Sequence, residues 1–129
     1  MIYLDTSVAL SHLLAENRRP PSSLWEQTVI SSRLLEYEVW NRLHARNLEA
    51  SHGEFARQLL GRLALVELAS PILARALEPF PTSVRTLDAL HLATLGYLRA
   101  NGQRISLASY DKQMNRTAAA MQFPLFDLS

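Results

Sequence analysis

The sequence of 129 residues contains no cysteine, only four glycines and no long hydrophobic run. Without cysteine, the chain forms neither a disulfide framework nor a thiolate-rich zinc site. Apolar runs of only a few residues exclude a membrane-spanning helix, and Asp5 stands where a signal peptide requires a continuous apolar core. We therefore expect a cytoplasmic protein with no membrane contact, folded as one domain over residues 1–129.

Lysine is nearly absent as well, because Lys112 stands alone beside twelve arginines, and the net charge is only +1. That small net charge does not indicate a general binder of polyanions. The arginine bias suits phosphate recognition, since a guanidinium binds phosphate with two hydrogen bonds, but a GC-rich genome produces the same bias. Any attraction for a nucleic acid is therefore expected to be local.

What the sequence does contain is an alternation of short β-prone runs and amphipathic helical segments. Strands are expected at residues 2–4, 28–32, 63–68, 104–110 and 123–126. Helices are expected at residues 6–15, 24–26, 34–47, 51–60, 71–77, 83–100 and 112–121. Because parallel strands require crossover connections, this alternation predicts an α/β fold: a mostly parallel central sheet of about five short strands, flanked by helices on both faces.

Three of the four aspartates occupy related positions in this pattern. Asp5 ends the first predicted strand, Asp111 ends the fourth, and Asp88 lies in the early turns of the longest helix. The carboxyl ends of parallel strands share one edge of the sheet, and the helices that follow the strands begin at that edge. Glu38 joins the three aspartates there if the helix after the second strand begins near residue 33 or 34.

Each of these acids also has an ordinary explanation when it is considered alone. Asp5 and Asp111 suit turns at strand ends, Asp88 suits a helix N-terminus, and Glu38 is spaced for an ion pair with Arg42. Their shared place favours a common site, because four neighbouring carboxylates repel one another unless a cation lies among them.

An all-oxygen site suits Mg²⁺ or Mn²⁺ better than zinc, since the four histidines lack the spacing of zinc ligands. His91 lies one turn after Asp88, so it either orients that carboxylate or packs in the core. A divalent ion held by carboxylates aligns water with a phosphate and neutralises the departing oxygen. The pattern therefore favours hydrolysis at a phosphoryl group.

Four segments of the chain resemble PIN-domain proteins, and in particular the VapC-type toxins of bacterial toxin–antitoxin modules. They are Ile2–Ser7, Ser31–Asn41, Leu87–Ala93 and Leu107–Asp111. The resemblance spans nearly the whole chain and implies that Asp5, Glu38, Asp88 and Asp111 form the catalytic, metal-binding set. It also implies that Thr6 or Ser7 holds either the first aspartate or a water on the metal.

The same resemblance implies an activity and partners. The expected activity is that of a Mg²⁺- or Mn²⁺-dependent endoribonuclease, which leaves a 5′-phosphate and a 3′-hydroxyl. The expected assembly is a homodimer, inhibited by a small antitoxin protein whose C-terminal segment enters the active groove.

Glu36 is a second acid close to Glu38, about 160° away around a helix, so the two side chains cannot both reach one metal ion. Alignment with the motif favours Glu38. Glu36 is expected to pair with Arg33 or to contact an antitoxin.

RNA is expected to be held by arginines near the active edge, because the net charge is too small for attraction by the whole surface. The candidates are Arg42, Arg85 and Arg116. Arg18 and Arg19 either extend this groove or belong to a solvated loop.

Two alternatives stay open at this point. A receiver-like domain shares the size and an acidic Mg²⁺ pocket, but it requires a phosphoacceptor aspartate near mid-chain, and no aspartate lies between Asp5 and Asp88. A catalytically silent PIN-fold module would act by binding or regulation alone, which the presence of all four acids disfavours. Metal-free cleavage through the RNA 2′-hydroxyl requires a base and acid pair, for which only His91 is suitably placed.

Overall fold

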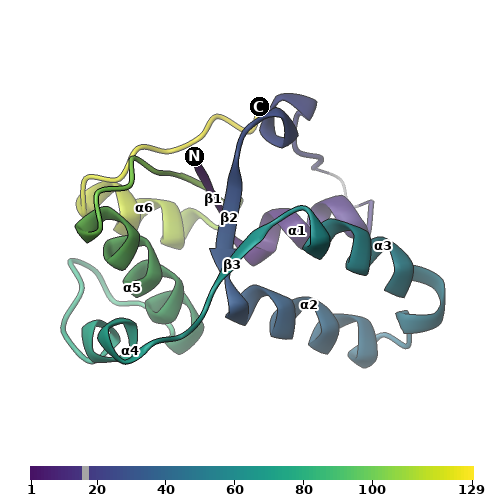
Figure 1. Ribbon diagram of the computed structural model, residues 1–129, viewed down its shortest axis with the longest axis horizontal. Coiled ribbons are helices and arrows are strands. Elements are labelled where there is room, and N and C mark those ends of the chain that lie inside the picture. Colours follow the sequence, from purple (N-terminus) through teal and green to yellow (C-terminus); the bar gives the residue numbers. More distant parts are fainter. Residues whose placement is uncertain (16–17) are drawn as a thin grey trace.

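The computed structural model describes residues 1–15 and 18–129 and shows strands and helices alternating along the chain (Figure 1). The strands are β1 (Ile2–Leu4), β2 (Val29–Ser32), β3 (Ala64–Val66) and β4 (Ser106–Ala108). The helices are α1 (Thr6–Leu13), the 3₁₀ helix η1 (Ser22–Glu26), α2 (Arg33–Ala45), α3 (Glu49–Gly61), α4 (Ser70–Ala76), α5 (Thr86–Ala100) and α6 (Lys112–Ala120).

The four strands form one parallel sheet in the order β3-β2-β1-β4. This confirms the predicted α/β class, with four strands where about five were expected. The fifth expected strand, residues 123–126, is reduced to one parallel bridge between Leu107 and Leu125. Pro124 has no backbone N–H to extend that ladder, although its carbonyl accepts a hydrogen bond from the Leu107 N–H at 2.9 Å.

Helices cover both faces of the sheet, as predicted, with α1, α2 and α3 on one side and α4, α5 and α6 on the other (Figure 1). Successive side chains of a strand point to opposite faces, so each strand contributes to two cores. On β1, Ile2 and Leu4 pack in the core below α1, α2 and α3, whereas Tyr3 packs among residues of α5 and α6. The whole of β1 is therefore buried.

Most helix boundaries differ from those predicted by one to three residues, and the largest difference is at the start of α5. Helix α5 begins at Thr86 and not at residue 83, because the Ser83 carbonyl is bound by the Gln113 side chain at 2.8 Å and the next residues stay extended. Helix α3 begins at Glu49, two residues earlier than expected. The later start of α5 matters for function, since it moves Asp88 into the first turn of the helix.

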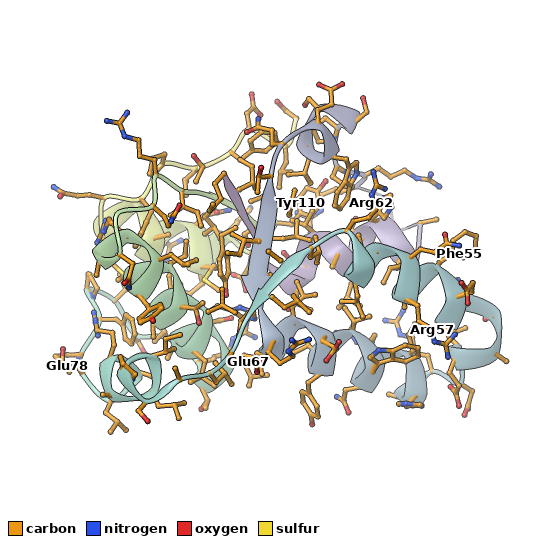
Figure 2. All side chains as sticks on the ribbon, viewed as in Figure 1. Phe55, Arg57, Arg62, Glu67, Glu78 and Tyr110 are labelled. Atoms are coloured by element: carbon orange, nitrogen blue, oxygen red, sulfur yellow. The ribbon has the colours of Figure 1, made fainter. Side chains whose placement is uncertain are left out.

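Phe55 differs from its helical neighbours Leu59 and Leu60, which are buried. It projects outward from α3, and 62% of its surface is exposed (Figure 2).

Among the described residues, the helices are all too short or too polar to cross a bilayer.

The strand order determines where a site can form. Strand β1 lies between β2 and β4. The segments that follow β1 and β4 therefore lead away from each other at the carboxyl ends of these two strands. In open parallel sheets, ligands bind in the crevice at such a point. Asp5 follows β1 there, and the segment from Ser109 to Asp111 follows β4.

Candidate active site

One cavity of about 510 Å³ lies at this crevice, and all four predicted acids line it. The lining residues are Asp5, Thr6, Ser7, Leu10, Glu38, Arg42, Arg85, Thr86, Leu87, Asp88 and Asp111. The acids come from four separate parts of the chain: the end of β1, helix α2, the first turn of α5 and the N-terminal cap of α6. The predicted convergence of the acids at one edge is therefore what the fold produces.

Asp5 is the most enclosed of the four acids, with only 5% of its surface exposed. Its backbone N–H donates to the Ala108 carbonyl at 2.9 Å, which ties it to β4. Its Oδ2 accepts hydrogen bonds from Ser7 Oγ at 2.6 Å and from Ser109 Oγ at 2.8 Å. Ser7 therefore does hold the first aspartate, as the resemblance implied.

Glu38 reaches the cavity because α2 begins directly after β2. The Ser32 side chain caps the helix by accepting the Leu34 N–H at 3.0 Å, so the helix starts at residue 33 and Glu38 lies in its second turn. Its Oε1 accepts a hydrogen bond from Thr6 Oγ1 at 2.7 Å. Thr6 thus donates its hydrogen bond to Glu38, whereas Ser7 donates to Asp5.

His91 is buried in the core, which was one of its two expected positions, and the acid that it contacts is Glu38. Its Nε2 lies 2.6 Å from Glu38 Oε1, and its Nδ1 lies 2.7 Å from the Tyr3 hydroxyl. The interpretation in which His91 orients Asp88 is therefore wrong. The ring is 1% exposed and points toward β1 and α2, while Asp88, three residues earlier on α5, faces the N-terminal end of its helix.

Asp88 and Asp111 are joined by Arg85, which is the N-terminal cap residue of α5. Arg85 Nε lies 3.2 Å from Asp88 Oδ2, and Arg85 Nη2 lies 2.9 Å from Asp111 Oδ2. Asp111 also caps α6, because its Oδ1 accepts the backbone N–H groups of Gln113 and Met114. One oxygen of Asp111 therefore holds the helix and the other faces Arg85.

The electrostatics of the cavity reflect this crowding of negative charge. Burial raises the pKa of the Asp88 carboxyl above its ordinary value, and the nearby Asp111 and Asp5 carboxylates raise it further. The hydrogen bond and the charge of Arg85 act in the opposite direction. The Asp88 hydrogen bond, in turn, raises the pKa of the Arg85 guanidinium. Arg85 thus supplies positive charge to a site that disfavours further anions.

The donor set fits a hard divalent cation by its chemistry. Asp5 and Glu38 are each anchored through one oxygen by side-chain donors, and among the described residues no protein group donates to the other oxygen, Asp5 Oδ1 or Glu38 Oε2. Such an arrangement leaves carboxylate oxygens that Mg²⁺ or Mn²⁺ prefers. Within residues 1–15 and 18–129, however, no three metal-binding side chains are grouped closely enough to form a ready-made metal cluster. Mutual repulsion of the carboxylates disfavours closer approach in the absence of an added cation.

The predicted arginines fall in different places. Arg42 and Arg85 line the cavity, whereas Arg116 is exposed on α6 and donates to Gln113 Oε1 at 3.2 Å. The Arg18 guanidinium lies 4.6 Å from the centre of the Tyr110 ring. Tyr110 directly precedes Asp111 in the sequence.

Arg19 is exposed in its loop and is not among the residues that line the cavity. Glu36 lies 3.5 Å from Arg33 and lines a separate cavity, which agrees with the first of its two expected roles, the pair with Arg33.

Ser109 is a site residue that sequence reasoning did not single out. Besides its bond to Asp5, its Oγ accepts the Asp111 N–H at 3.0 Å. Its position at a strand exit, two residues before an aspartate, was the available signal. Tyr3 was likewise read only as part of a strand, because nothing local indicates its bond to His91.

Comparison with known proteins gives both a family and a curated relative. The family model described as "PIN domain" matches residues 2–120. Ribonuclease VapC47 of Mycobacterium tuberculosis (strain CDC 1551 / Oshkosh) is 28% identical over 121 residues, which cover 88% of this chain and 87% of that protein.

Two solved structures share the fold. One is a toxin–antitoxin complex from Klebsiella pneumoniae, with a TM-score of 0.67 and 17% identity over 94% of this chain and 92% of that chain. The other is Mycobacterium tuberculosis VapC20, described as a sarcin–ricin loop cleaving toxin, with a TM-score of 0.66 and 17% identity over 90% of this chain and 94% of that chain. At these identities the likeness concerns the fold. Together with the family match, these findings confirm the resemblance drawn from the four motifs.

Proposed function

This chain belongs to the PIN domain family, and from that premise we propose that it is a divalent-metal-dependent endoribonuclease of the VapC toxin type. The observation that carries the proposal is the single cavity lined by Asp5, Glu38, Asp88 and Asp111. The family match also removes the receiver-like alternative. The similarity to a curated ribonuclease over most of both chains supports RNA as the substrate.

The four carboxylates would hold Mg²⁺ or Mn²⁺ at the cavity. When bound, such an ion lowers the pKa of a coordinated water and neutralises charge on a phosphate. The protein's own part is to keep the carboxylates in place: Ser7 and Ser109 fix Asp5 through its Oδ2, and Thr6 fixes Glu38 through its Oε1. The proposed reaction is attack of water on phosphorus with breakage of the bond to the 3′ oxygen, which leaves a 5′-phosphate and a 3′-hydroxyl.

Arg42 and Arg85 are the residues best placed to bind RNA phosphates, because both line the cavity. Arg116 is less well placed to bind RNA phosphates, because it is an exposed cation on α6 that lies outside the lining of the cavity. Since the net charge is only +1, these contacts would position one phosphate at the acids and would not attract RNA over the whole surface.

The proposal includes the partners that a toxin requires. The substrate is RNA in the cytoplasm, the chain forms a homodimer, and a small antitoxin inhibits it by placing a C-terminal segment in the cavity. A toxin–antitoxin complex among the structures of the same fold supports the antitoxin.

The decisive experiment is cleavage of a labelled RNA by the purified protein in Mg²⁺ or Mn²⁺, with and without EDTA. We expect cleavage that leaves a 5′-phosphate, stops on chelation and returns when metal is added. An RNA with one 2′-deoxy substitution at the scissile nucleotide should still be cut. Activity that survives chelation, or that requires the 2′-hydroxyl, contradicts the mechanism.

The substrate in cells is found by sequencing RNA 5′ ends after induced expression, with Asp5→Asn as the matched control. New 5′ ends that appear only with the unaltered protein support a nuclease. If no new ends appear although the protein still binds RNA or an antitoxin, the chain is instead the catalytically silent binding module.

A further inference from the structure

A buried chain of hydrogen bonds runs from the middle of the sheet to the cavity. It begins at the Tyr3 hydroxyl on β1, passes through both ring nitrogens of His91 on α5, and ends at Glu38 Oε1 on α2. Tyr3 and His91 are 0% and 1% exposed, and their rings meet edge to face with centroids 5.8 Å apart. Three elements far apart in sequence are thus connected by polar contacts inside the core.

The direction of these hydrogen bonds follows from the chemistry of their ends. Burial raises the pKa of the Tyr3 phenol, so its O–H remains available to donate. When that O–H donates to Nδ1, the ring proton of a neutral His91 lies on Nε2, from which it donates to the Glu38 carboxylate. In this arrangement His91 supplies one N–H to Glu38 at a fixed position.

Both donors to Glu38 reach the same oxygen. Thr6 Oγ1 lies 2.7 Å from Oε1 and His91 Nε2 lies 2.6 Å from it, whereas no group of the described residues donates to Oε2. Glutamate has one more rotatable bond than aspartate, so its carboxylate loses more conformational freedom when it is held in place. Two converging donors restrict that freedom and leave Oε2 of this cavity-lining residue without a protein donor among the described residues.

Apolar packing alone does not account for this arrangement. The helix α5 continues below His91 with Leu92, Leu95 and Leu98, which pack in the same core as Tyr3. An apolar residue at position 91 would continue that packing, but it would leave the buried Tyr3 hydroxyl without the partner that His91 provides. The imidazole does what an apolar side chain cannot do, since it connects Tyr3 to the carboxylate.

We propose that His91, held by Tyr3, is a positioning residue that sets the orientation of Glu38 for divalent-metal binding. The inference rests on the proposed function, because it assumes that Glu38 is a metal ligand. Residues that orient a metal ligand change metal affinity by about 10- to 100-fold when they are replaced.

The test replaces His91 with two amide side chains, each of which keeps one of the two contacts that the ring nitrogens make. In His91→Gln the amide nitrogen is as many bonds from Cβ as Nε2, so the donor to Glu38 is retained. In His91→Asn the amide is placed like Nδ1, so the contact to Tyr3 is kept and the donor to Glu38 is lost. Binding of Mn²⁺ to the full chain is measured by calorimetry, with circular dichroism and thermal melting to verify folding.

We expect His91→Asn to raise the Mn²⁺ dissociation constant at least about 10-fold, and His91→Gln to stay within about threefold of the unaltered protein. In a Glu38→Gln background, His91→Asn should have no further effect. Equal losses in the Gln and Asn variants, or unchanged affinity in a folded Asn variant, overturn the proposal.

Two further variants keep the result decisive. If His91→Asn does not fold, Tyr3→Phe tests the same chain of hydrogen bonds, because it preserves the ring packing and removes only the hydroxyl. A Mn²⁺ dissociation constant raised about threefold or more in Tyr3→Phe supports the proposal, and an unchanged one overturns it. Glu38→Gln separates this inference from its premise. If Glu38→Gln leaves Mn²⁺ binding unchanged, the proposed function of the cavity fails; if it weakens binding while His91→Asn does not, only the role of His91 fails.

Discussion

Ser109 and Asp5, 104 positions apart in the chain, are joined by a hydrogen bond of 2.8 Å from Ser109 Oγ to Asp5 Oδ2. The same oxygen of Ser109 accepts the Asp111 N–H at 3.0 Å. One buried hydroxyl therefore connects the end of β1 to the beginning of α6, and it fixes two of the four acids relative to one another.

Replacement of this hydroxyl should be costly. Ser109→Ala removes a hydrogen bond to a carboxylate and leaves the partly buried Asp111 N–H without its acceptor, so we expect the free energy of unfolding to fall by about 1–3 kcal/mol. Urea unfolding in metal-free buffer measures this. The matched control is Ser83→Ala at an exposed position, which should stay within about 0.5 kcal/mol. Equal stabilities for the two variants would show that Ser109 does not hold the site together.

The acids should be required for cleavage and dispensable for folding. Asp5→Asn and Asp88→Asn each remove a proposed metal ligand, whose loss costs several kcal/mol in the transition state if the proposed function holds, so we expect RNA cleavage to fall by about 100-fold or more. Circular dichroism should show an intact fold in both variants. Asp127→Asn changes an exposed aspartate outside the cavity lining and should retain full activity. A pronounced loss of structure in Asp5→Asn would instead assign that residue a structural role.

The raised pKa of Asp88 predicts a dependence of stability on pH. Protonation of Asp88 stabilises the folded state fully below the unfolded-chain pKa of about 3.9, and this contribution is lost as the pH rises through the raised folded pKa. Asp88→Asn should therefore be more stable than the unaltered protein at pH 7 in EDTA, and the difference should disappear by about pH 3. Urea unfolding across this range checks the sign.

The control for that experiment has the opposite sign. The Ser129 side chain lowers the pKa of the Asp127 carboxyl, so ionised Asp127 contributes stability above the unfolded pKa that is lost as the pH falls. Asp127→Asn should thus be no more stable than the unaltered protein at pH 7. A gain in stability with both replacements would point to a general effect of net charge.

Arg85 should compete with a divalent cation. Its guanidinium bridges Asp88 and Asp111, so Arg85→Gln should lower the Mn²⁺ dissociation constant by about threefold or more, because a neighbouring positive charge is removed. The same variant should bind RNA more weakly and with less dependence on salt. Arg116→Gln removes an equal charge that lies outside the cavity lining and should leave Mn²⁺ affinity unchanged. An unchanged dissociation constant in Arg85→Gln would show that metal and guanidinium do not share the site.

The convergence of the four acids was predictable, whereas most of their partners were not. Asp5, Asp111 and Glu38 could be placed because a strand end or an early helical turn at the edge of a parallel sheet has a known location. Helical spacing offered Asp88 as a partner of His91, with packing in the core as the alternative, but the ring lies against Glu38 and Tyr3, which belong to other elements. Spacing along one helix describes neighbours on that helix and does not describe which neighbouring element a side chain meets.

Element boundaries show the same limit. The late start of α5 depends on the Gln113 side chain, which binds the Ser83 carbonyl across the fold. The last expected strand was reduced to one bridge because Pro124 interrupts the ladder at the edge of the sheet. In both places a contact or a missing donor outside the local pattern decided the result.

The amino-acid sequence by itself determined the α/β class, the parallel sheet and the four acids at its edge, because strand and helix periodicity and the geometry of crossover connections are local properties that a single chain displays. Tertiary structure alone decided that Ser109 holds Asp5, that Arg85 bridges Asp88 and Asp111, and that His91 serves Glu38. These pairings join residues between 3 and 104 positions apart, and their geometry depends on how the helices pack against the sheet and on which face each side chain presents there.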